Sequence, residues 1–263
     1  MRSLNGLALG LSLALLTTLN QAGAESVPLY QQRVETAQPD QEALDHSRKL
    51  LKEHKDVEIK EKFVIQPFHK QSGELETAPG AFCRQCHGPL PHSKQLRTRA
   101  FNNMHVRYIA CETCHFRPEN LKFEYRWFDY LKNQPYQGPN LFRLDQGKDN
   151  AEQRSANPKI APFLDNQPVF ILKDSLFSEQ VAKQWKTLQG EEKVLLRAKI
   201  HWPLQKKGPE CQDCHDEKNS RLDLKALGAT DKQVTAITQH VIPQFFRRYK
   251  KDDEKITIRD MLH

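Results

Sequence analysis

The chain has 263 residues, a formal net charge of +7 and an apolar content of 38%. This length suits one large or two small domains, and so few apolar residues would give the polypeptide alone a thin core. Basic residues are spread along the chain among nearly as many acidic ones, 40 against 33, which disfavours a nucleic-acid-binding protein.

The first 24 residues have the features of an export signal. Arg2 gives a positive start, residues 7–19 are an unbroken apolar run, and residues 22–24 are small, as signal peptidase requires. The run is too short for a membrane-spanning helix, and no later segment approaches 18 consecutive apolar residues. The sequence therefore predicts a periplasmic or cell-surface protein that begins at Glu25 and has no membrane span. A buried N-terminal helix is the alternative.

Two elements are predicted in the polar region that follows. Residues 40–54 have apolar side chains at helical spacing after an acidic start, which predicts a helix. Residues 57–68 alternate enough to predict a strand. Solvent exposure is the default for the three histidines of this region, which are His46, His54 and His69.

All six cysteines belong to CxxCH motifs. Two thiols at this spacing can add to the two vinyl groups of one haem, and the histidine that follows directs its imidazole at the iron. The pattern predicts three covalently attached haem c groups with proximal ligands His87, His115 and His215. The motifs are Cys83-Arg-Gln-Cys86-His87, Cys111-Glu-Thr-Cys114-His115 and Cys211-Gln-Asp-Cys214-His215.

Disulfides, redox-active dithiols and zinc sites are the other uses of such cysteine pairs. Zinc would combine CxxC pairs into four-thiolate sites and leave one of the three pairs over. A redox dithiol needs no histidine after its second cysteine. Haem attachment uses all six cysteines, and six haem propionates would roughly cancel the charge of +6 that remains once Arg2 leaves with the signal.

The motifs give the chain a resemblance to the multihaem c-type cytochromes of the bacterial periplasm. Residues 83–115 look like a compact di-haem unit, and residues 201–228 are a second, looser similarity, whereas 25–78 and 121–195 match no such protein. The resemblance implies a mainly helical, irregular fold that is organised by haem packing. It also implies an electron-transfer protein.

The second axial ligand of each haem iron is expected to be histidine, because only three methionines exist and one leaves with the signal. His92 follows His87 too closely to reach the other face of the same haem, so it is assigned to the second haem. By the same argument His105, six residues before Cys111, is assigned to the first. A surface or hydrogen-bonded histidine is the alternative for each.

The third haem has two candidate ligands. His201 lies ten residues before Cys211, and His240 lies among apolar neighbours that also suit a core histidine. We favour His201 and keep His240 as the runner-up. An iron without a second ligand would keep one face open, as catalysis requires.

Further elements are predicted beyond the second motif. The aromatic residues of 124–144 are expected to pack in the core and against haem edges, and 159–174 predicts a β-hairpin that turns at Asp165-Asn166. Three helical patterns follow: 176–188, 191–200 after a break near Gly190, and 231–251 with an interruption at Pro243.

The expected organisation has four parts after the signal. They are a polar region at 25–78, a di-haem unit at 79–120, an insert of unknown role at 121–200 and a third-haem segment with a C-terminal helix at 201–263. The close spacing of the first two motifs predicts that their haems stack nearly in contact.

The sequence predicts a low-potential electron carrier of a periplasmic respiratory chain, because two histidines on one iron generally lower its potential. Expected partners are redox proteins, such as a membrane quinol oxidase or an outer-membrane conduit. A small reductase of nitrogen or sulfur oxyanions with one open haem face is the alternative. The C-terminal basic residues would either steer an acidic partner or form a solvated helix face; they are Arg247, Arg248, Lys250 and Lys251.

Overall fold

The computed structural model describes residues 26–53, 80–94, 98–137, 140 and 158–249. Several sequence predictions fall outside these ranges. They are the export signal, the strand at 57–68 and the positions of His54, His69, Lys250 and Lys251.

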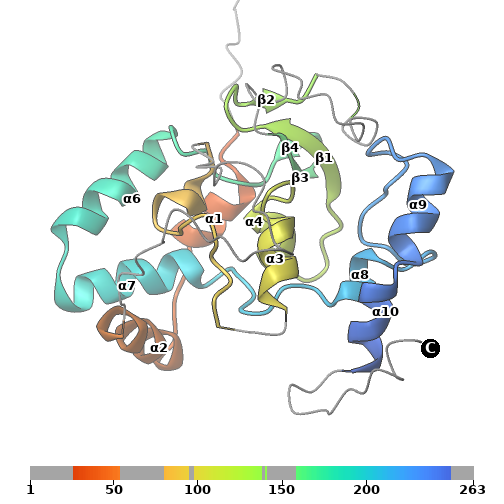
Figure 1. The fold of residues 1–263 in the computed structure, drawn as a ribbon. Coiled ribbons are helices and arrows are strands. Elements are labelled where there is room, and N and C mark those ends of the chain that lie inside the picture. The colour runs from red at the N-terminus through yellow and green to blue at the C-terminus, as the bar shows by residue number, and fades with distance from the viewer. Residues whose placement is uncertain (1–25, 54–79, 95–97, 138–139, 141–157, 250–263) are drawn as a thin grey trace, which may run out of the picture.

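An antiparallel sheet of four strands lies in the middle of the fold (Figure 1). Its order is β2-β1-β3-β4, with β1 at Glu124–Asp129, β2 at Gln134–Pro135, β3 at Pro158–Leu164 and β4 at Gln167–Pro168. The predicted hairpin around Asp165 and Asn166 is confirmed as the β3–β4 turn. Both residues have positive φ, 49° and 65°, as the tight hairpin turn with two left-handed residues requires.

One group of helices packs beside the sheet. It contains α1 (Leu29–Glu35), α2 (Gln41–Lys52), α6 (Leu176–Thr187) and α7 (Gly190–His201). The helices predicted near 40–54, 176–188 and 191–200 are therefore confirmed. The break between the last two falls at Gly190, whose φ of +53° favours a residue without Cβ.

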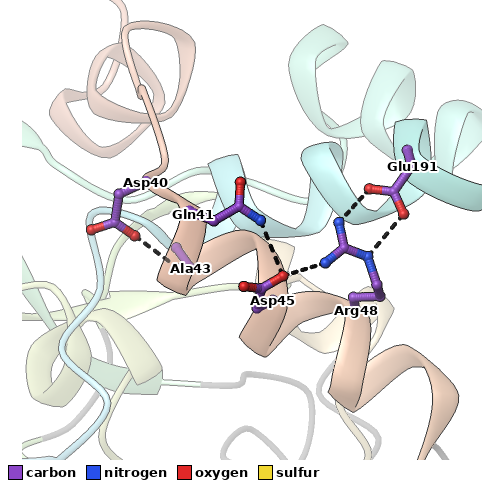
Figure 2. Close-up of polar contacts among 6 residues, drawn as sticks. All are labelled: Asp40, Gln41, Ala43, Asp45, Arg48 and Glu191. Atoms are coloured by element: carbon purple, nitrogen blue, oxygen red, sulfur yellow. Dashed lines mark hydrogen bonds and ion pairs between the residues drawn. The ribbon is translucent and has the colours of Figure 1, made fainter.

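The helix α2 is capped at its start and joined to α7 (Figure 2). The Asp40 carboxylate accepts a hydrogen bond of 2.8 Å from the Ala43 backbone N–H, which satisfies one of the free amides of the first turn. Arg48 donates two hydrogen bonds to Glu191 of α7, at 2.9 and 2.6 Å, and also contacts Asp45. These contacts join α2 to α7, the helix that ends at His201.

The other helices are short. They are η1 (Phe82–Gln85), α3 (Arg99–His105), α4 (Cys111–His115), α8 (Cys211–Cys214), α9 (Asp231–Thr238) and α10 (Val241–Arg248). The predicted C-terminal helix is interrupted, but at Gln239–His240 rather than at Pro243. Proline sits in the first turn of α10, where its missing N–H costs no helical hydrogen bond.

Three apolar clusters form the core. The first surrounds Tyr30, Phe82 and Phe116, the second lies on the sheet around Phe128 and Phe170, and the third consists of Ile160 with three leucines and an alanine of the segment 222–229. The aromatic residues of β1 and its turn thus pack in the core as expected. Within the described ranges no helix has the length and apolarity needed to cross a bilayer.

The fold therefore combines helices with one antiparallel sheet of four strands, so the predicted helices and hairpin are present but the sheet is larger than the predicted hairpin. The hairpin of β3 and β4 was predicted, whereas β1 and β2 were not, and β2 is only two residues long. Burial in β1 increases along the strand, from exposed Glu124 to buried Phe128 and Asp129, so β1 lacks the alternation that marks a half-buried strand.

Candidate functional site

Each CxxCH motif lies on a single helical turn. The second motif is α4 itself, the third forms α8 with His215 as its C-cap, and the first forms η1 and the two residues after it. In the first and third motifs the histidine backbone N–H donates to the carbonyl of the first cysteine, at 3.0 and 2.9 Å. A helical turn places residues i and i+3 on the same face, so both thiols and the histidine that follows project together.

Every motif histidine faces a second histidine from a distant part of the chain. The ring centres of His87 and His201 are 6.0 Å apart, and their planes make an angle of 75°. For His115 and His92 the values are 6.2 Å and 21°. The third pair has a spacing of 6.1 Å and an angle of 64°, and it consists of His215 and His105.

This spacing fits two imidazoles on opposite faces of one metal ion. Metal–imidazole bonds of about 2.0–2.1 Å on both sides place the two ring centres roughly 6 Å apart. Rings in direct stacking contact would lie closer together. Each of the three pairs is therefore spaced as two imidazoles on opposite faces of one metal ion would be.

The structure brings His92 to the second motif, as expected, but exchanges the other two candidates. His105 lies against His215 of the third motif, and His201 lies against His87 of the first. The chain argument that excluded the nearest haem for His105 was sound. It offered only the first haem as the alternative, because the position of the third motif could not be derived from spacing.

Core packing accounts for the position of His201. Tyr30, which is fully buried in the first apolar cluster beside Phe82, donates a 2.9 Å hydrogen bond to the Ile200 carbonyl. The end of α7 is thereby fixed next to the first motif. Just beyond it, the Gln205 backbone N–H donates to the His115 carbonyl at 2.8 Å.

An aromatic contact accounts for the position of His105. Phe101 of α3 packs edge-on against Phe246 of α10, with ring centres 5.5 Å apart. Because α10 also packs on α8, this contact brings α3 and its last residue beside the third motif. The runner-up His240 has a different task, since its Nδ1 accepts the Ile242 backbone N–H at the start of α10.

Hydrogen bonds fix the protonation of these imidazoles. The Nδ1–H groups of His115, His201 and His215 donate to backbone carbonyls at 2.8–2.9 Å, and the His105 ring is bonded to the Phe101 carbonyl. A carbonyl can only accept, so where Nδ1 carries the proton, Nε2 keeps its lone pair. Histidines that bind metals usually have such a partner on the second nitrogen.

Burial also favours the neutral imidazole that a metal requires. It lowers the pKa of His92 and His105, and it lowers the pKa of His201 to about 4. His46, in contrast, is exposed on α2, as the sequence predicted.

The cysteines of different motifs lie close together, and all six are free thiols. The thiols of Cys83 and Cys111 are hydrogen-bonded to each other, which links the first two motifs. Burial and, to a smaller extent, the nearby Cys214 of the third motif together raise the pKa of Cys114 to about 12. In the described part of the chain, no three histidine, cysteine or acidic side chains converge as a zinc site would require.

A buried acid beside these thiols was not found from the sequence. Glu112, between the cysteines of the second motif, is 1% exposed, and its Oε1 lies 3.3 Å from the Cys83 sulfur. Its Oε2 and the Tyr130 hydroxyl are both buried and have no hydrogen-bond partner among the described residues. Burial raises the pKa of Glu112, which favours the neutral carboxyl over the carboxylate. Glu112 occupies one of the two variable positions of its CxxCH motif, and nothing in the sequence indicates that a glutamate there is buried.

Replacement of Glu112 by glutamine should change how stability depends on pH. Between the ordinary glutamate pKa and the raised pKa of Glu112, the native state holds a proton that the unfolded chain has lost. Within this pH range the free energy of unfolding therefore falls by about 1.4 kcal/mol for each unit that the pH rises. E112Q should lose this slope and be the more stable form at neutral pH. Urea unfolding of the haem-loaded protein across this pH range measures the effect, with the exposed Glu124→Gln as control. Identical pH profiles for E112Q and the parent would contradict it.

Three kinds of comparison were made with known proteins. Neither the protein-family models, nor the curated proteins, nor the solved structures contain a match to this chain. The chemistry of the site therefore follows from its own residues, which are three cysteine pairs and three facing pairs of histidines.

Proposed function

We propose that this chain is a three-haem c-type cytochrome that carries electrons. The observation that supports it best is that each CxxCH histidine faces a second histidine, at 6.0–6.2 Å between ring centres. When bound, haem iron supplies a one-electron redox couple, and two histidine ligands favour a low potential. The residues hold the haems and set their surroundings.

The proposed ligand pairs leave no iron with an open face. The first haem takes His87 and His201, and the other pairs are His115 with His92 and His215 with His105. A reductase needs one iron without a protein ligand on its substrate side, so this pairing favours a carrier over the oxyanion reductase.

The positions of the cysteines suggest the order of the haems. Cys83 and Cys111 are in contact, and Cys114 lies near Cys214, so thioethers at these positions would place the second haem between the other two. Short separations between neighbouring haems are what electron transfer along such a row requires. The N-terminal signal pattern supports a periplasmic location, where redox proteins would be the partners.

The test is to express the full chain with a haem-ligation system and to measure its mass and its spin states. We expect three haems that remain attached after denaturation, and only low-spin ferric iron. The near-parallel rings of the second pair should give one rhombic low-spin resonance, and the two steeply inclined pairs should give highly anisotropic signals. Fewer than three haems would refute the proposal, and a high-spin fraction with reduction of nitrite, hydroxylamine or sulfite would favour the reductase.

A further inference from the structure

His92 is held differently from the other candidate ligands. The ring of His92 is bonded to a side chain, the amide of Asn103. Four other candidate ligands have rings that are bonded to backbone carbonyls instead, and these are His105, His115, His201 and His215. Three hydrogen bonds join His92 and Asn103. Asn103 Oδ1 accepts from the His92 backbone N–H at 3.0 Å and from ring Nδ1 at 3.2 Å, and its Nδ2 donates to the His92 carbonyl at 3.0 Å.

The backbone bonds determine which end of the amide faces the ring. A backbone N–H can only donate and a backbone carbonyl can only accept, so the atom shared by the N–H and the ring must be the amide oxygen. The proton of the imidazole is therefore on Nδ1, and Nε2 is left for the iron. Asn103 thus fixes the tautomer of His92 as well as its position.

The surroundings of His92 leave this task to Asn103. The segment Gly88–Lys94 contains no helix or strand, so no regular backbone pattern orients His92. Asn103 lies on α3, two residues before His105, which faces the third motif. One short helix therefore carries a ligand of the third haem and the residue that positions a ligand of the second.

We propose that Asn103 is a positioning residue for the middle haem, which sets the bond between His92 and its iron and thereby the potential of that haem. This inference rests on the proposed function. An acceptor at Nδ1–H makes an imidazole a stronger donor to the metal, which stabilises the ferric state. Because this acceptor is a side chain, a single substitution can alter it.

Three variants of the haem-loaded protein test the proposal. N103L removes all three hydrogen bonds, so His92 should dissociate readily from the iron. The reduced protein should then bind carbon monoxide at one haem of the three, and the rhombic resonance should weaken.

N103D keeps the acceptor and makes it anionic. It should stay low-spin and shift the reduction equilibrium of that haem at least tenfold towards the ferric form, a fall of about 59 mV. N102L is the matched control, since the Asn102 side chain donates to Thr98 and has no hydrogen bond to a histidine among the described residues, and it should leave both readouts unchanged.

The outcomes separate this inference from the proposed function. Parent protein without three low-spin haems refutes the proposed function itself. In a second outcome, the parent protein carries three low-spin haems while N103L and N103D keep its potentials and still do not bind carbon monoxide. That result refutes the role of Asn103 and leaves the proposed function intact. A merely structural residue would make N103D at least as damaging as N103L, with no fall in potential. Adding N103L to H92A should change nothing further if Asn103 acts through His92.

Discussion

Replacement of His201 by alanine should turn one of the three haems high-spin and raise its potential. His201 is the residue that faces His87 across 6.0 Å, so its loss leaves the first haem with a single histidine ligand. The variant should bind carbon monoxide in the reduced state and lose one of the highly anisotropic low-spin resonances. Optical and paramagnetic resonance spectra of the purified protein measure both changes.

The haem affected by each histidine can be identified in a chain without the third motif. With Cys211, Cys214 and His215 replaced by alanine, two haems should remain. In that background H201A should still produce one high-spin haem, whereas H105A should add none, because its partner histidine is gone. The opposite pattern would restore the assignment expected from sequence spacing. The exposed His46 is the matched control, and H46A should leave all spectra unchanged.

Replacement of Phe116 by alanine should cost about 3–5 kcal/mol of unfolding free energy, the usual range for a large buried aromatic residue. Phe116 follows the second motif directly and is 1% exposed. Its ring packs against Tyr30 at 5.1 Å and against Phe123 at 5.8 Å between centres. Alanine would leave a cavity in the first apolar cluster.

Urea unfolding of the haem-loaded protein, followed by far-ultraviolet circular dichroism, measures this loss. Leu176 provides the control, because its side chain is 79% exposed at the start of α6. L176A should change the unfolding free energy by no more than about 0.5 kcal/mol. A loss below about 1 kcal/mol for F116A would mean that the haems, rather than this cluster, hold the second motif in place.

Local patterns in the sequence determined several elements correctly. Helical patterns in the sequence located α2, α6 and α7, and Asp165-Asn166 located the hairpin turn. The three CxxCH motifs were found in the same way, because their chemistry depends on residues that are three or four positions apart. His92 was matched to the second motif because a short chain leaves few places that it can reach.

Only the tertiary structure decided which distant residues meet. His201 reaches the first motif because Tyr30 binds the end of α7, and His105 reaches the third because Phe101 packs on Phe246. Asn103 and Glu112 gave no signal in the sequence, since burial and hydrogen bonding of a polar residue depend on what packs around it. The sequence by itself therefore determined the local elements and the three cysteine–histidine motifs of this protein. The pairing of its histidines depended on contacts between segments up to 170 residues apart, which no local pattern encodes.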